Sequence, residues 1–186
     1  MMEWLWKLDA DILLFLQEYA RMPVLNEILQ FYTNLGNAGL IAILTCAVLL
    51  ILPKTRSVGL AAAVSLFIEF LIVNVLLKNA VARIRPYEVI EGLECITKLA
   101  TDYSFPSGHT GSCFAVATVM FLKLPKRYGV PALFLAVLMA YSRLYVGVHY
   151  PTDVLAAFLI GVLVAVVVCR VISHWRVNLL LHKEQS

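Results

Sequence analysis

Five stretches of this chain approach the length and apolarity needed to cross a lipid bilayer, and no other feature of the sequence constrains the fold as strongly. The hydrocarbon core of a bilayer is about 30 Å thick, which a helix of roughly 20 apolar residues can span. We expect helices, because backbone groups that face lipid must be hydrogen-bonded within their own segment. The five segments are residues 37–52, 57–77, 107–124, 131–146 and 152–172.

The composition supports this assignment. Of 186 residues, 61% are apolar and 15% are charged, whereas soluble domains average roughly 45–50% and about 25%. The net charge of +3 is too small and too dispersed to indicate a nucleic-acid partner. The four cysteines form no C-x-x-C pair, so neither a disulfide framework nor a zinc site is indicated. We expect an all-α integral membrane bundle of five transmembrane helices, with a sixth possible.

The N-terminal segment, residues 1–21, has the pattern of an amphipathic helix that lies in the membrane interface. It lacks the uninterrupted apolar run and the small-residue cleavage site of a signal peptide. A short sixth span is the alternative. The chain therefore divides, as a single domain, into an interfacial helix at 1–21, a membrane core at 25–172 and a cytoplasmic tail at 173–186. The apolar face consists of Trp4, Leu5, Leu8, Ile12, Phe15, Leu16 and Tyr19.

Lysine and arginine residues are unequally distributed between the two ends of the predicted spans. By the positive-inside rule, the end with more of them is cytoplasmic. The long polar connection 78–106 and the short connection 147–151 then lie together on the extracytoplasmic side. The richer end holds Lys54, Arg56, Lys123, Lys126, Arg127, Arg170, Arg176 and Lys183, and the other holds Lys78, Arg83, Arg85, Lys98 and Arg143.

Three short polar stretches meet at this outer end. In the first, Lys78 and Arg85 are seven residues apart, which is about two turns of helix, so a continuing helix would direct both at one anion. Helix-end cations also serve as simple membrane anchors. In the second, Ser107, Gly108 and His109 precede an apolar run. A plain helix start explains them, but a helix N-terminus also offers free N–H groups to an anion.

The third stretch runs from Ser142 to Asp153. Arg143 lies near the end of an apolar helix, where an unpaired cation is costly, so it requires a partner such as a phosphate. His149 and Asp153 are four residues apart across a predicted helix start, a spacing that can place a carboxylate against an imidazole. Such a pair is either a buried hydrogen-bonded contact or the nucleophile and orienting acid of a catalytic site.

Taken in order, the patterns K-x6-R-P, P-S-G-H and S-R-x5-H-x3-D resemble the three-part signature of the type 2 phosphatidic acid phosphatase (PAP2) superfamily, which includes vanadium haloperoxidases. Every signature position is matched, and the resemblance extends from about Pro23 to Ile172. The chain is most similar to the small bacterial integral-membrane lipid phosphatases, among them undecaprenyl-diphosphate phosphatases. This implies a multi-pass protein of the bacterial inner membrane whose substrate is a lipid phosphate.

The resemblance also implies a role for each signature residue. Lys78, Arg85 and Arg143, together with Ser107 and the Gly108 N–H, would bind the phosphoryl oxygens. His149 would attack phosphorus, Asp153 would orient His149, and His109 would protonate the leaving oxygen and then activate water. No acidic cluster has metal-ligand spacing, so we expect no metal and no cofactor. The preferred substrate is undecaprenyl diphosphate, with phosphatidylglycerophosphate or phosphatidate as alternatives.

Two other classes of function remain open at this point. His109 and His149 could ligate a haem or a metal, although haem between helices favours histidines inside the spans. Arg143 and Glu69 could line a transport path, although the helices lack the paired halves typical of transporters. Glu69 is interpreted as a helix-packing or protonated carboxyl group, and the role of Asn74 is left undecided. Arg83 and Lys98 are spare cations in the outer loop for a second phosphate.

Overall fold

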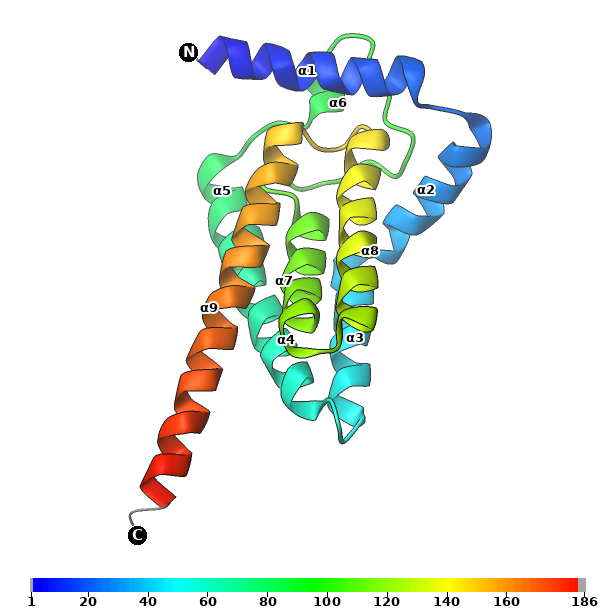
Figure 1. Cartoon of the computed structure of the whole chain (residues 1–186). Helices are drawn as coiled ribbons and strands as arrows, with labels where there is room; N and C mark the ends of the chain where they lie inside the picture. The colour runs from blue at the N-terminus through cyan, green and yellow to red at the C-terminus, as the bar shows by residue number, and fades with distance from the viewer. Residues whose placement is uncertain (1, 184–186) are drawn as a thin grey trace.

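The computed structural model describes residues 2–183, and within this range the chain is helical without any strand. The predicted all-α bundle is confirmed. Its main helices are α3 (Leu40–Ile51), α4 (Arg56–Phe70), α7 (Gly108–Lys123), α8 (Lys126–Tyr145) and α9 (Pro151–Lys183). Figure 1 shows these helices running side by side, with α7 in the middle and α1 (Met2–Tyr19) lying across one end of the bundle.

Three helical stretches among the described residues have the length and apolarity to cross a membrane: Arg56–Val89, Lys126–Tyr145 and Pro151–His174. The pair Pro23–Leu35 and Asn37–Ile51, bent by 50°, makes a fourth candidate. The remaining predicted segment, 107–124, forms α7, whose 16 residues correspond to about 24 Å of helix. Because α7 packs against α4, α8 and α9, most of its surface faces other helices rather than lipid.

Two boundaries differ from the predicted segments. Helix α8 begins at Lys126, ahead of the segment predicted from residue 131, and Pro131 lies inside it. Because proline has no N–H, α8 lacks one backbone hydrogen bond in its second turn. Helix α9 continues beyond residue 172 to Lys183, so the predicted cytoplasmic tail is helical up to that residue. At the start of this segment the side chain of His174 is exposed.

The bundle is apolar on its outside and carries polar groups within. Phe67, Phe134 and Leu163 are each more than 60% exposed, whereas Ser65 and Glu69 are fully buried. A soluble protein has the opposite distribution, so the surroundings that suit this surface are lipid. The helices approach closely at small residues, as is common in membrane bundles. A Cβ atom on Gly161 of α9, for example, would lie 2.6 Å from the carbonyl oxygen of Gly111 on α7.

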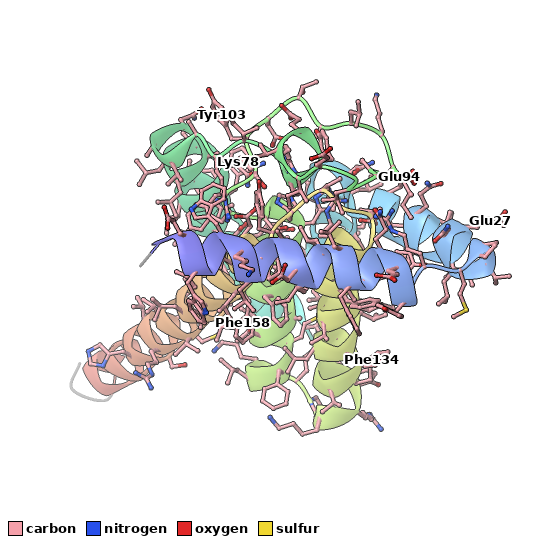
Figure 2. All side chains as sticks on the ribbon, turned by 90° about the horizontal axis from the view of Figure 1, so that it is seen from above. Glu27, Lys78, Glu94, Tyr103, Phe134 and Phe158 are labelled. Atoms are coloured by element: carbon pink, nitrogen blue, oxygen red, sulfur yellow. The ribbon has the colours of Figure 1, made fainter. Side chains whose placement is uncertain are left out.

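Helix α1 has three distinct faces. Asp9 and Leu13 face the bundle and are almost completely buried. The large apolar side chains of Trp4, Phe15 and Tyr19 remain exposed on a second face, and the other charged residues of the helix occupy a third. This division is the one expected of a helix that contacts protein, lipid and water at once, as the sequence predicts for an interfacial helix. In Figure 2, α1 crosses the end of the bundle with the labelled Lys78, Tyr103 and Glu94 to one side.

The segment between α4 and α7 builds the end of the bundle beneath α1. Its first part is the π-helix η2 (Leu71–Leu77), which is followed by the short helices α5 (Lys78–Val81) and α6 (Pro86–Val89). A loop over residues 90–107 then leads to α7. The loop is tied to α1, since the amide of Gln17 donates to the Gly92 carbonyl at 2.8 Å and accepts from the Glu94 N–H at 2.8 Å.

Candidate active site

The three polar stretches come together around one cavity of about 940 Å³. It is bounded by α4, η2 and α7, by the 97–102 part of the loop, and by the turn η1 (Asn37–Gly39) that follows α2 (Pro23–Leu35). The side that carries cations and histidines lies beneath the end of the bundle that α1 covers (Figure 1). The predicted site residues that line the cavity are Lys78, Arg85, Gly108, His109, Arg143 and His149.

Lys78 and Arg85 share the cavity, but not through a continuous helix. Helix α5 ends at Val81, and Ala82 adopts a left-handed conformation with φ 47°. Arg85 is extended, with φ −68° and ψ 147°, as is favoured for a residue that precedes proline. The assumption that both cations lie on one helical face is therefore wrong. The chain turns instead, and brings the two side chains to the same acceptor.

That acceptor is Asp102, which lies in the polar connection 78–106. Its carboxylate pairs with the Lys78 ammonium group and also accepts from Arg85 Nη2 at 2.6 Å. Burial raises the pKa of Asp102, but its contacts with Lys78 and Arg85 outweigh burial and lower this pKa to about 2. The carboxylate is thus ionised at neutral pH. It lies where a phosphate bound to the same two cations would have to compete with it.

His149 is buried, and its two ring nitrogens have different surroundings. Nε2 lies 3.1 Å from Nη1 of Arg85, and Nδ1 lies 3.5 Å from the Asp153 carboxylate. Because a guanidinium group can only donate, Nε2 is the acceptor and the ring proton lies on Nδ1, toward Asp153. Burial, followed by the charges of Arg85, Arg143 and Lys78, lowers the pKa of His149 well below its usual value. The ring is neutral, and its Nε2 lone pair is directed at Arg85 on the wall of the cavity.

Asp153 is fully buried behind His149 and is held by three further donors. Its carboxylate accepts from the Ser104 hydroxyl at 2.5 Å, the Tyr150 N–H at 3.1 Å and Arg83 Nη1 at 2.6 Å. Arg83 is therefore engaged on the far side of His149, so the idea that it is a spare cation for a second phosphate is wrong. Lys98, the other spare cation, does line the cavity.

The start of α7 lies on the opposite wall. His109 Nε2 is 3.1 Å from the amide oxygen of Asn37, a contact that the sequence pattern does not indicate. Gly108 packs against Asn74, and a Cβ atom on this glycine would lie 2.7 Å from the Asn74 amide oxygen. Ser107 is fully buried and accepts from the Thr110 hydroxyl at 3.0 Å. It is not among the residues that line the cavity.

Arg143 extends into the cavity from α8 and is 5% exposed. Its Nη1 donates to the Thr33 hydroxyl at 2.6 Å, while its Nε has no hydrogen-bond partner among the described residues. A buried guanidinium group that has unused donors is costly unless an anion binds it. Arg143 is thus well suited to bind an oxyanion.

Away from the cations the cavity becomes largely apolar. Ile43 and Leu50 of α3 face Phe67 and Phe70 of α4 across this part. Glu69 also lines it, fully buried, and neither of its carboxyl oxygens has a hydrogen-bond partner within the described part of the chain. A cavity that is cationic at one end and mostly apolar at the other can hold an amphiphile with a phosphate head and a hydrocarbon tail.

Comparisons with known proteins agree with this geometry. Residues 56–176 match the family model of the PAP2 superfamily. The chain is 34% identical over 143 residues to a protein named undecaprenyl-diphosphatase from Sulfolobus acidocaldarius, a match that covers 77% of this chain and 68% of the relative. It is 29% identical to undecaprenyl-diphosphatase BcrC from Bacillus subtilis, with 76% and 72% of the two chains covered.

The fold is also similar to that of a solved structure. The crystal structure of a transmembrane PAP2-type phosphatidylglycerolphosphate phosphatase from Bacillus subtilis superposes with a TM-score of 0.73 at 28% sequence identity. The match covers 90% of this chain and 86% of that one. Family, relatives and fold all lead to one assignment. The chain belongs to the PAP2 superfamily and is a multi-pass membrane phosphatase of lipid phosphates.

Proposed function

We propose that this phosphatase removes the terminal phosphate of undecaprenyl diphosphate at the outer leaflet of a bacterial inner membrane, through a phosphohistidine formed on His149. One observation carries the proposal: a single cavity joins Lys78, Arg85 and Arg143 to an apolar part between α3 and α4. In phosphoryl transfer the attacked atom is phosphorus and the transition state is loose, so positioned charge and proton transfer supply most of the catalysis. Cations and two imidazoles provide both.

In the proposed first step, Nε2 of His149 attacks the terminal phosphorus and the bond to the bridging oxygen breaks. Asp153 holds the Nδ1 proton and stabilises the positive ring that results. His109 gives a proton to the departing lipid phosphate. In the second step His109 takes a proton from water, the hydroxide attacks phosphorus and the P–N bond breaks, which frees phosphate and restores His149.

Lys78, Arg85 and Arg143 bind the phosphoryl oxygens in both proposed steps, with the Gly108 N–H at the start of α7. Asp102 has to yield Lys78 and Arg85 to the substrate, since one set of donors cannot serve two anions fully. Ser107 acts by shaping the first turn of α7, because it is buried against Thr110. We propose that no metal takes part, because the three cations provide the charge that magnesium supplies to other phosphoryl-transfer enzymes.

Two relatives named undecaprenyl-diphosphatase support the choice of a lipid diphosphate. A second candidate is phosphatidylglycerophosphate, because the similar solved structure is a phosphatase of that lipid and because phosphatidylglycerophosphatase B of Bacillus subtilis is 32% identical to this chain. Both lipids carry a terminal phosphate and an apolar tail. They differ in the group that leaves, which is a second phosphate in the first case and a glycerol hydroxyl in the second.

Competition between the two lipids in detergent tests the substrate. We expect kcat/KM to be higher for undecaprenyl diphosphate, since Lys98 at the cavity mouth can pair with the second phosphate. A Lys98→Ala variant should lower kcat/KM for this diphosphate several-fold more than for a monophosphate, with Lys54→Ala at the other end of the bundle as the control. If phosphatidylglycerophosphate is preferred more than tenfold, a difference of about 1.4 kcal/mol in transition-state binding, the choice of lipid is wrong.

The proposed orientation predicts the labelling of single cysteines on intact cells. In a Cys95→Ser background, a Glu91→Cys variant carries its thiol in the exposed outer loop, and a Lys54→Cys variant carries it in the exposed turn between α3 and α4. An impermeant maleimide should label the first in intact cells and the second only after permeabilisation. The reverse pattern would place the site on the cytoplasmic side, where it could not act on the outer leaflet.

A further inference from the structure

Arg83 links the interfacial helix to the acid behind His149. Its guanidinium donates through Nη1 to Asp153 at 2.6 Å and through Nη2 to Asp9 of α1 at 2.8 Å. The group also contacts two aromatic rings, 3.6 Å from the ring centre of Tyr150 and 4.6 Å from that of Trp6. The side chains of Arg83, Asp9 and Asp153 are 12%, 3% and 0% exposed, so water screens these pairs only weakly.

Asp9 also binds the start of α9, the helix that carries Asp153. Its carboxylate accepts from the Thr152 N–H at 3.0 Å and from the Thr152 hydroxyl at 2.6 Å. A carboxylate at this position satisfies a free backbone donor and interacts favourably with the positive end of the helix dipole. One residue of α1 thus contacts both the first turn of α9 and the cation that binds Asp153, as the position of α1 over the end of α9 in Figure 1 allows.

We propose that Asp9 is a positioning residue for phosphoryl transfer, acting through Arg83 on the Asp153–His149 pair, and that α1 is therefore part of the catalytic apparatus as well as a membrane contact. The proposal rests on the roles assigned above to His149 and Asp153. Asp9 touches neither the cavity nor His149, so its effect must pass through Arg83 and the start of α9.

One cation, Arg83, is shared between two acids, Asp9 and Asp153. While Asp9 is ionised, Arg83 divides its donors between Asp9 and Asp153, and the Asp153 charge remains available to the ring of His149. Without the charge on Asp9, Asp153 is the only acid that Arg83 pairs with, beside its neutral partner Thr152, and Arg83 neutralises more of the Asp153 charge. The positive ring of the phosphohistidine then loses stabilisation. The remaining charged groups that act on His149 are Lys78, Arg85, Asp102 and Arg143.

The test compares Asp9→Asn with Asp11→Asn, a matched control in the same helix whose side chain is exposed. Asparagine keeps one acceptor oxygen for Thr152, removes the charge, and replaces the second acceptor oxygen by an NH2 group. We expect kcat to fall about tenfold in Asp9→Asn with KM unchanged, because the phosphate-binding cations are untouched. The acid limb of kcat/KM against pH should move to lower pH relative to wild type, since loss of a nearby negative charge lowers the pKa of His149.

Two further variants separate the possible outcomes. Asp9→Glu should recover part of kcat, and adding Asp9→Asn to Arg83→Gln should cost little beyond Arg83→Gln alone, because Asp9 acts through Arg83. A loss of kcat that is equal at every pH, with a matching loss of thermal stability, would mean that Asp9 only anchors α1 and would overturn the proposal. So would an unchanged kcat. His149→Ala is assayed in parallel: if it remains active, the proposed mechanism itself fails, whatever Asp9→Asn does.

Discussion

Replacing His149 by alanine should reduce kcat by at least about 10⁴-fold, the largest effect that we expect from any single substitution in this chain. The alanine removes the Nε2 atom that faces the cavity beside Arg85, so no covalent intermediate can form. The fold should survive, because the ring is buried but contributes few of the hydrogen bonds around it. The measurement is the initial rate of phosphate release in detergent, with thermal unfolding followed on the same sample.

His109→Ala provides a graded comparison, since it removes a proton donor rather than the nucleophile. A loss of about 10²–10⁴-fold is typical of general acid–base catalysis. His174→Ala, on an exposed part of α9 far along the chain from the site, is the control and should leave the rate unchanged. A His149→Ala protein that retains near wild-type activity would rule out the phosphohistidine and would indicate direct attack of water on phosphorus.

The grouping of the three signature stretches was predictable, because each of them lies where a predicted membrane-spanning segment reaches the same side of the membrane. Helices that cross a bilayer in alternating directions bring alternate connections to one face, so topology alone gathers Lys78, His109 and His149. Helix counts and directions need only hydropathy and charge. The apolar exterior follows in the same way, since residues such as Phe134 face lipid rather than the core.

The contacts that organise the site were not predictable, because they come from irregular backbone. Spacing alone suggested a helix from Lys78 to Arg85, but a left-handed residue at Ala82 ends it and turns the chain. The same turn sends Arg83 away from the cavity to Asp153 and leaves Arg85 inside it. Periodicity carries no information about such a turn. It indicates which residues share a helix face only while the helix lasts.

Asp102 was missed for a related reason. In the sequence it is one of several acidic residues in a long loop, and nothing local distinguishes it from Glu88 or Glu91. Only the folded loop brings its carboxylate to both Lys78 and Arg85. The proximity of Asp102 to the S-F-P-S-G-H stretch was the one available signal. An acid so close in the sequence to the phosphate-binding residues is well placed to pair with them.

Replacing Arg143 by methionine should lower kcat/KM by about 10²–10³-fold, which is the cost of removing one positioned donor from a developing oxyanion. Arg143→Lys should recover only part of this loss, since an ammonium group keeps the charge but lacks the planar fork of a guanidinium. Arg127→Met, at the other end of the same helix, should retain full activity. Hydrolysis of the preferred lipid by all three variants gives the measurement.

The same substitution should not weaken the fold, and this separates a substrate-binding role for Arg143 from a structural one. Its guanidinium is buried, Nη1 donates to the neutral Thr33 hydroxyl, and Nε has no hydrogen-bond partner within the part of the chain that the structure describes. An apolar side chain therefore removes a desolvation cost. We expect the Tm of Arg143→Met to equal or exceed that of the wild type. Vanadate, a phosphate analogue that stabilises any protein able to bind it, should raise the Tm of the wild type more than that of the variant. A variant that melts earlier but hydrolyses lipid normally would show that Arg143 stabilises the contact between α8 and α2 and does not bind phosphate.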